Sequence, residues 1–304
     1  MKKIALLSVL VLSLLRCAPP ADTASRGEIT IAADESFKPV LDQLTHAYHG
    51  VYPNAIFNMV YKPEQESILL LLGQKARMIV TSRKLNAQEN TILKQQKGAV
   101  KEIDIATDGL ALIQSKANSD SMITIKQLQG LFDGSIKTWA ELGGGNQKEA
   151  VTLVFDNDNS SNITYALDKF KIKDPSKIRI FTTKSNVEVI NFVKKNPSAI
   201  GFIGVNWISD GDLAISAELS KGLRVMGVAD SNKVYYQPFQ RDLGLKNYPL
   251  RRQVYMISRE GYSGLATGMI NYVMRDVGSL VIEKCGLWPR VVYDREVNIK
   301  KVKI

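Results

Sequence analysis

The sequence predicts an α/β protein of two lobes, each built on a largely parallel sheet flanked by helices. Segments of strand length alternate with segments of helical periodicity, the alternation starts again in the second half, and no long linker separates the halves. The chain has 304 residues, enough for about two domains. Hydrophobic residues make up 45% and charged residues 23%, which excludes collagen, a disulfide scaffold, a disordered tail protein and a multi-span membrane protein.

In the first unit, strands and helices follow one another at short intervals. Apolar or β-rich stretches predict strands at residues 27–33, 55–61 and 78–81. After the first strand, Pro39 stands early in a helical turn, and apolar residues then recur at helical spacing, at Val40, Leu41, Leu44 and Tyr48. Residues 67–72 predict a buried helical segment, and Asn86 with Glu89 forms a capping box that opens the next helix.

The same succession starts again further along the chain. Helices are expected over 124–132, over 139–142 and from Ile163, and strands over 151–155, 178–181 and 199–204. Ser185 and Glu188 are spaced as a second capping box. Short crossings near residues 105–112 and 237–251 would join the lobes. We therefore expect lobe I at 27–107 and 247–304, and lobe II at 108–246.

The first residues are typical of a secretory leader. Lys2 and Lys3 precede an apolar run at 4–15, too short to span a bilayer but suited to a signal peptide, which we place at 1–16. Residues 14–17 resemble the lipobox of bacterial lipoproteins, whose cysteine, here Cys17, is acylated, although Arg16 departs from the small residue usual there. Residues 17–26 would be a flexible tether. A secreted protein with an incidental Cys17 is the alternative; with Cys17 acylated, only Cys285 remains, which excludes an internal disulfide.

The formal net charge of +10 favours anionic partners. The cations are scattered, and Tyr235, Tyr236 and Phe239 are better explained by a lobe-crossing strand than by a nucleic-acid stacking surface. The sequence holds no P-loop, GxGxxG motif or nucleophile elbow. We therefore expect no nucleic acid, no metal and no cofactor.

Clusters of Ser, Thr and Asn stand where a predicted strand ends and a helix begins. The four clusters lie at residues 36–37, 81–83, 159–162 and 183–186. Ligands of open α/β sheets bind beyond the carboxyl ends of the strands, where helix N-termini offer unpaired N–H groups and partial positive charge. Four clusters in two lobes therefore favour a shared anion site. The alternative is that each cluster merely caps its own helix.

Six segments occur in an order that carries a family resemblance. They are Ala-Asp-Glu-Ser-Phe-Lys-Pro at 33–39, Tyr-Pro at 52–53, Tyr-Lys-Pro-Glu at 61–64, Thr-Ser-Arg-Lys-Leu at 81–85, Asn-Pro-Ser-Ala-Ile-Gly-Phe at 196–202 and Tyr-Pro-Leu at 248–250. Over residues 27–304 the chain resembles the periplasmic phosphate-binding proteins of bacterial phosphate ABC transporters, above all the lipoprotein branch of Bacteroidetes. The resemblance implies a two-lobe periplasmic binding protein fold (type II-like), hinged by crossing strands, that closes on orthophosphate and delivers it to a permease.

The resemblance also carries binding residues onto this chain. In the family, the loop after the first strand supplies a hydroxyl residue and a Phe N–H, and a Ser heads the next helix. Ser82 replaces the family's Asp in the loop after the third strand, and Asp156 replaces its Arg in the second lobe. The expected phosphate-binding set is Ser36, Phe37, Ser67, Ser82, Arg83, Asp156, Ser160, Ser161 and Asn162.

Arg83 and Asp156 stand at exchanged places, which predicts a charge swap across the cleft. Arg83 would clamp the anion through two parallel N–H···O bonds, and Asp156 would accept the proton of HPO4²⁻ or orient Arg83. A carboxylate facing the ligand rejects sulfate, which has no proton to donate. The alternatives are a surface cation for Arg83 and an Asx-turn for Asp156, with Glu64 and Glu66 as competing acceptors.

The sequence thus predicts a monomer that captures inorganic phosphate outside the cytoplasmic membrane and performs no chemistry. Its expected partners are an ABC transporter permease and the membrane, through the lipid anchor at Cys17. Three alternatives stay open: binding of another tetrahedral oxyanion, sensing of phosphate rather than transport, and a periplasmic phosphatase. The phosphatase would require a metal cluster or an activated nucleophile, and the sequence indicates neither.

Overall fold

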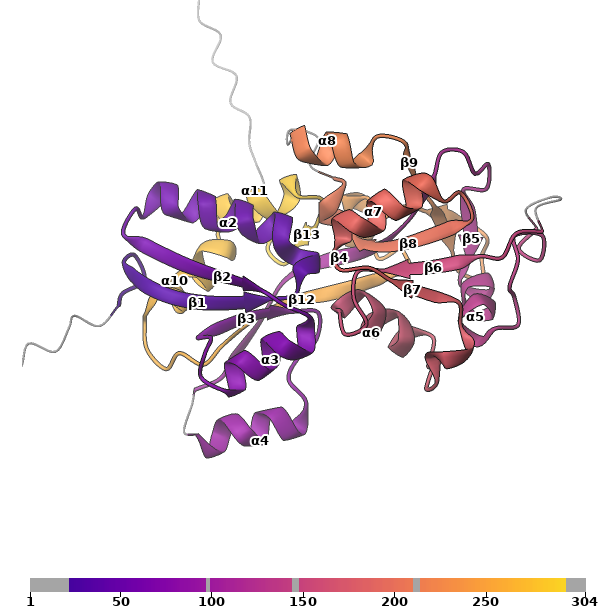
Figure 1. Cartoon of the computed structure of the whole chain (residues 1–304). Helices are drawn as coiled ribbons and strands as arrows, with labels where there is room; N and C mark the ends of the chain where they lie inside the picture. Colours follow the sequence, from indigo (N-terminus) through magenta and orange to yellow (C-terminus); the bar gives the residue numbers. More distant parts are fainter. Residues whose placement is uncertain (1–21, 97–98, 144–147, 210–213, 294–304) are drawn as a thin grey trace, which may run out of the picture.

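The computed structural model describes residues 22–96, 99–143, 148–209 and 214–293, and it shows two lobes side by side (Figure 1). The predicted signal peptide and Cys17 lie outside the described residues. Within the described part, every helix is too short or too polar to cross a membrane. The predicted two-lobe α/β fold, hinged by crossing strands, is confirmed.

The first lobe is a mixed sheet with helices on both faces (left in Figure 1). Strand β1 is parallel to β2 and β3, whereas β12 is antiparallel to β3 and β4. The elements of this lobe are β1 (Gly27–Ala33), η1 (Glu35–Phe37), α2 (Lys38–Val51), β2 (Ala55–Tyr61), α3 (Glu64–Leu72), β3 (Met78–Thr81), α4 (Ala87–Gln95), the first part of β4 (Lys101–Ser115), β12 (Arg251–Ser258), α10 (Leu265–Val273), α11 (Asp276–Lys284) and β13 (Trp288–Pro289).

Strand β1 shows how both faces of this sheet are covered. Successive side chains of a strand point to opposite faces. Ile29 and Ile31 belong to the core that includes α2 and α10, while Ala32 packs in a second core with residues of α3 and α4. Both faces are therefore covered at the end of the strand, where Ile31, Ala32 and Ala33 are all buried, whereas Glu28 near its start is exposed.

The second lobe is built on three parallel strands, with β6 between β7 and β8, and a small sheet of order β11-β10-β5 lies beside them. Its aromatic core includes the stacked rings of Phe155 and Phe202, whose centroids lie 4.5 Å apart. The elements of this lobe are β5 (Met122–Thr124), α5 (Ile125–Asp133), β6 (Thr152–Phe155), α6 (Ser161–Lys169), η2 (Pro175–Lys177), β7 (Ile180–Thr182), α7 (Asn186–Lys195), β8 (Ala199–Gly204), η3 (Val205–Trp207), α8 (Ala214–Ser220), β9 (Leu223–Val225), β10 (Gly227–Ala229), β11 (Tyr235–Tyr236) and α9 (Gln240–Gly244).

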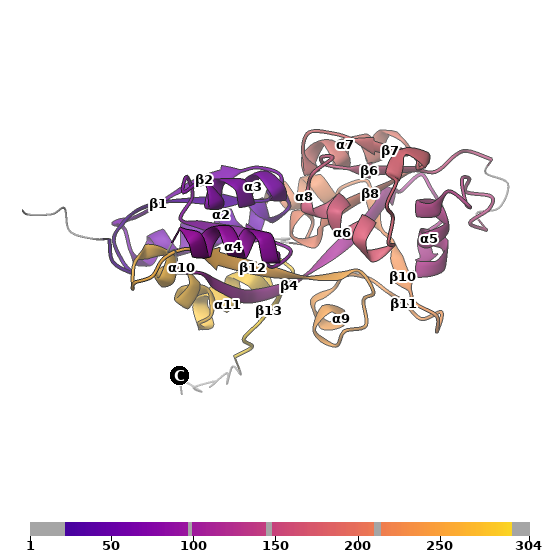
Figure 2. The same cartoon turned by 90° about the horizontal axis from the view of Figure 1, so that it is seen from below.

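Strand β4 runs from one lobe into the other (Figure 2). Its residues up to Gly109 pair with β12 in the first lobe, and its residues from Leu110 onwards pair with β8 and then β9 in the second. At this junction, a Cβ on Gly109 would lie 2.6 Å from Cβ of Pro238, so only glycine allows the returning chain to pass so closely. The crossing expected near 105–112 is thus confirmed.

Four predicted strands, at 27–33, 55–61, 78–81 and 199–204, have the predicted bounds. The helix predicted over 139–142 is wrong, because this segment forms turns. Its shape is set by tertiary contacts: the indole of Trp139 is buried and donates to the carbonyl oxygen of Ser198. The lobe-crossing strand predicted around Tyr235 is also wrong, since the connection consists of the two-residue β11 followed by the short helix α9.

The two predicted capping boxes differ. Asn86 and Glu89 form a complete box at the start of α4. At α7, Ser185 Oγ accepts the N–H of Glu188, but the carboxylate of Glu188 accepts the N–H of Lys184 instead of that of Ser185. The second box is therefore only half formed.

The end of the predicted tether is docked on the first lobe. Asp22 accepts hydrogen bonds from the N–H of Leu265 at the start of α10 and from the side chains of Arg77 and Tyr262. Gly27 approaches Asp22 so closely, at φ +126°, that a side chain there would collide with it. Residues 22–26 are therefore part of the folded lobe and not a free linker.

Candidate functional site

The predicted hydroxyl clusters lie at the carboxyl ends of β1, β3, β6 and β7, and those from the two lobes meet. The hydroxyls of Ser36 in lobe I and Ser161 in lobe II lie 3.2 Å apart. Both serines are fully buried. The expectation that helix starts from both lobes converge is therefore met at these two residues.

Asp34, the residue directly after β1, occupies the point of convergence. Its carboxylate accepts three backbone N–H groups: those of Ser36, Glu64 and Ser161, each at 2.9 Å. It also accepts the hydroxyls of Ser36 and Ser161. These donors come from η1, from the N-terminus of α3 and from the N-terminus of α6 in the opposite lobe. The site is thus an anion cage, and the anion within it is a side chain of the chain itself.

The next two residues of this loop also reach into lobe II. Oε2 of Glu35 accepts both the backbone N–H and the side-chain amide of Asn186, at the start of α7. The carbonyl oxygen of Ser36 accepts Nδ2 of Asn206 at 2.9 Å and Nε1 of Trp207 at 3.1 Å. Three consecutive residues of lobe I, 34–36, therefore bond three elements of lobe II; we call this segment the interlobe loop.

A buried ion pair supports the cage. The guanidinium of Arg252, on β12, bonds Asp108 on β4 at 2.9 Å and donates to Ser161 Oγ at 3.1 Å. The same guanidinium lies 5.1 Å from the ring centre of Phe37. Arg252 thus holds the Ser161 hydroxyl from behind while that hydroxyl donates to Asp34.

Asp156 forms a second cluster next to the cage. It accepts hydrogen bonds from Ser160 Oγ at 2.7 Å, Asn162 Nδ2 at 3.0 Å and Asn186 Nδ2 at 3.2 Å. Burial, with the nearby charge of Asp34, raises the pKa of Asp156 to about 7, and the hydrogen bonds oppose this rise only in part. Asp156 therefore changes its charge near neutral pH.

Ser82 and Arg83 surround Glu64 rather than the cage itself. Glu64 Oε1 accepts the N–H and hydroxyl of Ser82. The two parallel bonds predicted from Arg83 to an anion go to Glu89, both at 2.8 Å. Arg83 could therefore clamp an anion only after leaving Glu89. The predicted contact between Asp156 and Arg83 is not found among the described residues.

The remaining predicted residues lie close by with other partners. The Phe37 N–H donates to the backbone oxygen of Asp34, and Ser67 Oγ donates to the backbone oxygen of Lys62. Of the two competing acceptors, Glu64 is buried and its pKa is raised by burial and by Asp34. Glu66 is exposed and pairs at 3.8 Å with Lys62.

A cavity of about 110 Å³ adjoins the cage. Three of its lining residues are acidic, Asp34, Glu35 and Asp156, and two are basic, Lys62 and Lys184. The wall is completed by Tyr61, Pro63, Asn157 and Ser160. This cavity is large enough for a small tetrahedral ion and opens between the lobes beside the Asp34 carboxylate.

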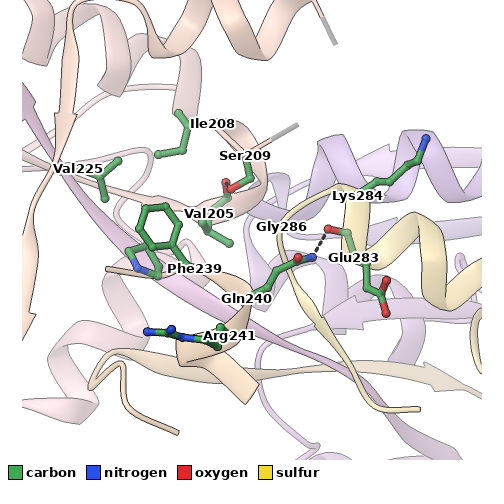
Figure 3. A pocket seen from close by; sticks show the side chains of 11 residues that line it. Val205, Ile208, Ser209, Val225, Phe239, Gln240, Arg241, Glu283, Lys284 and Gly286 are labelled. Carbon is green, nitrogen blue, oxygen red and sulfur yellow. Dashed lines mark hydrogen bonds between the residues drawn. The ribbon is translucent and has the colours of Figure 1, made fainter. Parts of the chain in front are cut away.

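A larger cavity, of about 520 Å³, lies at the junction of the lobes and shares no residue with the cage (Figure 3). On one side it is lined by Val205, Phe239 and Gln240, and on the other by residues of α11 and Gly286. Gln240 donates to the carbonyl oxygen of Glu283 across it. The cavity spans both lobes, and its charged lining residues are Arg241, Glu283 and Lys284.

Four residues central to this geometry were not among the predicted binding residues: Asp34, Glu35, Asn186 and Arg252. Asp34 and Glu35 could have been noticed in the sequence. They are two adjacent acids directly after a buried strand, at a place where an anion site needs hydrogen-bond donors and where acids are therefore unexpected. Arg252 carried a weaker signal, as a cation in an inward-facing position of an apolar strand. The sequence does not show which residues of lobe II are contacted by Asp34, Glu35 and Arg252.

Comparison with known proteins shows the superfamily of the chain. A model of the PBP superfamily domain matches residues 18–277. The chain belongs to the PBP superfamily. Among curated relatives, the phosphate-binding protein PstS of Borreliella burgdorferi is 25% identical over 270 residues, which cover 85% of this chain and 88% of that protein. PstS of Bacillus subtilis is 24% identical over 196 residues, 63% of this chain and 58% of its own. The resemblance to phosphate-binding proteins is thereby confirmed.

Solved structures share the fold. A putative phosphate ABC transporter substrate-binding protein with bound phosphate from Clostridium perfringens is 20% identical, with a TM-score of 0.71 over 86% of this chain and 99% of that chain. The OxyR2 regulatory domain from Vibrio vulnificus is 13% identical, with a TM-score of 0.51 over 82% and 97%. Proteins of different roles therefore carry this two-lobe fold, and the function must be argued from the site.

Proposed function

We propose that this chain is an extracytoplasmic receptor that binds inorganic phosphate between its lobes and delivers it to an ABC transporter permease. One observation carries the proposal: backbone N–H groups from both lobes, those of Ser36, Glu64 and Ser161, point at a single anionic group. Such amides stabilise an anion without a neutralising cation, because their dipoles are fixed by the fold. The PstS relatives, named for phosphate binding, support phosphate as the anion.

Phosphate would take the place now held by the Asp34 carboxylate. Its oxygens would accept the three amides and the hydroxyls of Ser36 and Ser161, with Arg252 behind Ser161. HPO4²⁻ has one proton to donate, and Asp156 on the adjoining cavity would accept it in its ionised form. Sulfate lacks that proton at neutral pH, so its oxygen would face the carboxylate without a hydrogen bond.

The other predicted residues take supporting roles in this proposal. Ser160 and Asn162 hold Asp156, Ser82 and Arg83 hold Glu64, and Phe37 stacks on Arg252, while Ser67 stabilises the start of α3. Lobe I would comprise 27–107 and 247–304, and lobe II 108–246; the change of partners of β4 at Gly109 and Leu110 supports this division. Closure would be a rotation of these two bodies about β4 and the return connection.

The N-terminal residues complete the proposal. A signal peptide at 1–16 would export the chain, and acylation of Cys17 would anchor it, as the lipobox resemblance implies. The folded lobe would then start at the docked Asp22, only five residues beyond the anchor. We propose that the protein works there as a monomer beside its permease and performs no reaction on the bound anion.

Isothermal titration calorimetry tests the proposal. At pH 7.5 the wild type should bind phosphate and reject sulfate, and Asp156→Asn should narrow the difference by weakening phosphate. Asp133→Asn, an exposed acid in lobe II, is the matched control and should change neither affinity. Equal affinity of the wild type for both anions would refute the role of Asp156 and favour a general oxyanion receptor.

Two further outcomes address the remaining alternatives. Turnover of a generic phosphomonoester by the purified protein would show a phosphatase. Phosphate binding without stimulation of transport when the permease is reconstituted would favour a phosphate sensor.

A further inference from the structure

We propose that Asp34 is a tethered competitor of the solute: it closes the lobes in the absence of phosphate and must leave the cage before phosphate binds. The closure part rests on geometry alone, while the competition part rests on the proposed function. The interlobe loop would thereby set both the affinity of the site and the anions able to enter it.

The hydrogen bonds of Asp34 exceed those of a local helix cap. An N-cap aspartate accepts one or two N–H groups of its own helix, as Asp34 does for Ser36. Asp34 additionally accepts the N–H of Glu64, 30 residues along the chain, and that of Ser161, 127 residues along the chain in the other lobe. A carboxylate that accepts donors from three helix starts occupies the position of a bound anion.

Occupation of this seat by Asp34 and by phosphate is mutually exclusive. Each backbone N–H has one hydrogen, and the hydrogens of Ser36, Glu64 and Ser161 are already directed at Asp34 oxygens. A phosphate oxygen accepting the same amides would lie where the carboxylate oxygens lie. Two anions sharing this buried position would also repel each other strongly. Phosphate therefore gains these donors only when the Asp34 side chain turns away.

The structure offers the displaced carboxylate a place to go. Asp34 already forms part of the wall of the 110 Å³ cavity, where Lys62 and Lys184 supply two cations. The carboxylate would exchange buried amides for these amines and water. An anion that binds the amides more weakly than a carboxylate would fail to displace it, so the tethered group excludes weak anions by competition.

Glu35 shows that the contact between the lobes extends along the interlobe loop. Its carboxylate is bound to Asn186, so consecutive acids of lobe I occupy the starts of two different helices of lobe II, α6 and α7. The carbonyl oxygen of Ser36 adds two further bonds across the cleft. The lobes are thus held together by groups of the chain itself, in the arrangement that a bound solute would otherwise impose.

The test compares the wild type with Asp34→Ala and Asp34→Asn after exhaustive removal of phosphate. Asp230→Ala is the matched control, because Asp230 is an exposed acid in the turn after β10, away from the cage. In small-angle X-ray scattering, the phosphate-free wild type and the control should have the same small radius of gyration. Both Asp34 variants should have a larger one, and added phosphate should reduce it to the wild-type value. Identical scattering of all phosphate-free proteins would overturn the closure.

Calorimetry with inorganic phosphate tests the competition. Asp34→Ala should bind phosphate at least tenfold more tightly than the wild type, because the tethered competitor is gone. Unchanged or weaker binding by Asp34→Ala would overturn the competition. If neither protein binds phosphate while the scattering still separates them, the proposed function fails and the closure by Asp34 stands.

A measurement on the wild type keeps the inference testable even where the variants do not fold. Amide hydrogen exchange of the peptide containing Ser161 should be slow without phosphate, because its N–H is bonded to Asp34. Adding phosphate should change this protection little, since one acceptor replaces another. Fast exchange at Ser161 without phosphate, followed by strong protection on its addition, would overturn the proposal.

Discussion

Asp34 and Asp156 are both buried carboxylates at strand ends, one in each lobe, but their surroundings differ in kind. Asp34 accepts three backbone N–H groups and two hydroxyls. The partners of Asp156 among the described residues are side chains alone, one hydroxyl and two amides. Backbone amides at helix starts are aimed by the fold and carry part of the helix dipole, whereas side-chain amides do not.

This difference separates two functions within one cleft. The cage around Asp34 is organised to hold a negative charge, which Asp34 supplies until a solute replaces it. The pKa of Asp156 is raised to about 7, mainly by burial, so this group holds or releases a proton near neutrality. An oxyanion that carries one proton is matched to both regions at once: its charge to the cage and its proton to the acid.

The largest expected effect concerns the support of the cage. Arg252→Met should lower the free energy of unfolding by about 3–5 kcal/mol, because it leaves Asp108 buried without its cation. It should also free the Ser161 hydroxyl that Arg252 holds, so the cage of Asp34 loosens while the cluster of Asp156 is untouched. Urea unfolding at pH 7 measures the loss.

The controls for this variant separate charge from burial. Arg241→Met removes an exposed guanidinium and should cost less than about 0.5 kcal/mol. The double variant Arg252→Met with Asp108→Leu removes the whole buried pair and should recover most of the stability. A loss below about 1 kcal/mol in Arg252→Met alone would contradict the supporting role of Arg252.

The second prediction concerns the proton of Asp156. The pKa of Asp156 is higher in the native state than in the unfolded state. The native state therefore binds more protons than the unfolded state between pH 4 and 7. The contribution of Asp156 to stability is therefore full below pH 4 and is lost as the pH rises to about 7. Asp156→Asn should remove up to about 4 kcal/mol of this fall in the free energy of unfolding. Chemical unfolding at a series of pH values measures the slope.

Some pH dependence should survive in this variant. Burial raises the pKa of Glu35 and of Glu64 as well, so both add slopes of the same sign. Asp133→Asn is the matched control: Asp133 is exposed and its pKa is lowered through hydrogen bonds with Ser135. Its contribution to stability is therefore constant above about pH 4 and is lost only as the pH falls further, outside the range of the test. A slope between pH 4 and 7 that is identical in the wild type and in Asp156→Asn would contradict the raised pKa.

The elements that the sequence predicted correctly are those whose pattern is local. Strand β3 and strand β8 are buried on both faces, so an apolar run of the right length was enough to place them. The turn at 138–143 was not predicted, because Trp139 takes its conformation from bonds to Glu149 and to Ser198, the latter 59 residues along the chain.

In the candidate site, too, the local features were predictable from the sequence and the contacts between the lobes were not. Hydroxyls at strand ends predicted that an anion cage exists, since capping donors are a local property of a helix start. The identity of its occupant was not predictable, because the bond between Asp34 and Ser161 depends on how two lobes meet across 127 residues. Arg252 was missed for the same reason: its place on an apolar strand was only a weak signal, and its buried partner Asp108 lies 144 residues away in the sequence.

A smaller effect is expected at Glu35, which lies beside Asp34 but whose pKa, like that of Asp156, is raised by burial. Glu35→Gln keeps one acceptor oxygen for Asn186 and removes a charge whose burial disfavours the folded state at pH 8. Relative to the wild type, the variant should therefore gain about 1 kcal/mol of unfolding free energy between pH 4 and pH 8, because the wild-type carboxyl loses its proton over this range and the amide does not change. A difference between the two proteins that is constant from pH 8 to pH 4 would show that the charge of Glu35 makes no contribution.

The smallest effect on phosphate binding is expected at Arg83, although its position in sequence suggested a clamp. Its guanidinium is bound in parallel by Glu89, whose carboxylate also completes the cap of α4. Arg83→Ala should therefore change phosphate affinity by less than about threefold and lower stability by about 1 kcal/mol. Glu89→Gln is the comparison, since it loosens the same helix start while leaving Arg83 in place. A tenfold loss of phosphate affinity in Arg83→Ala, absent in Glu89→Gln, would show that Arg83 leaves Glu89 when phosphate enters. Arg83 would then be a further cation of the cleft, in addition to Lys62 and Lys184.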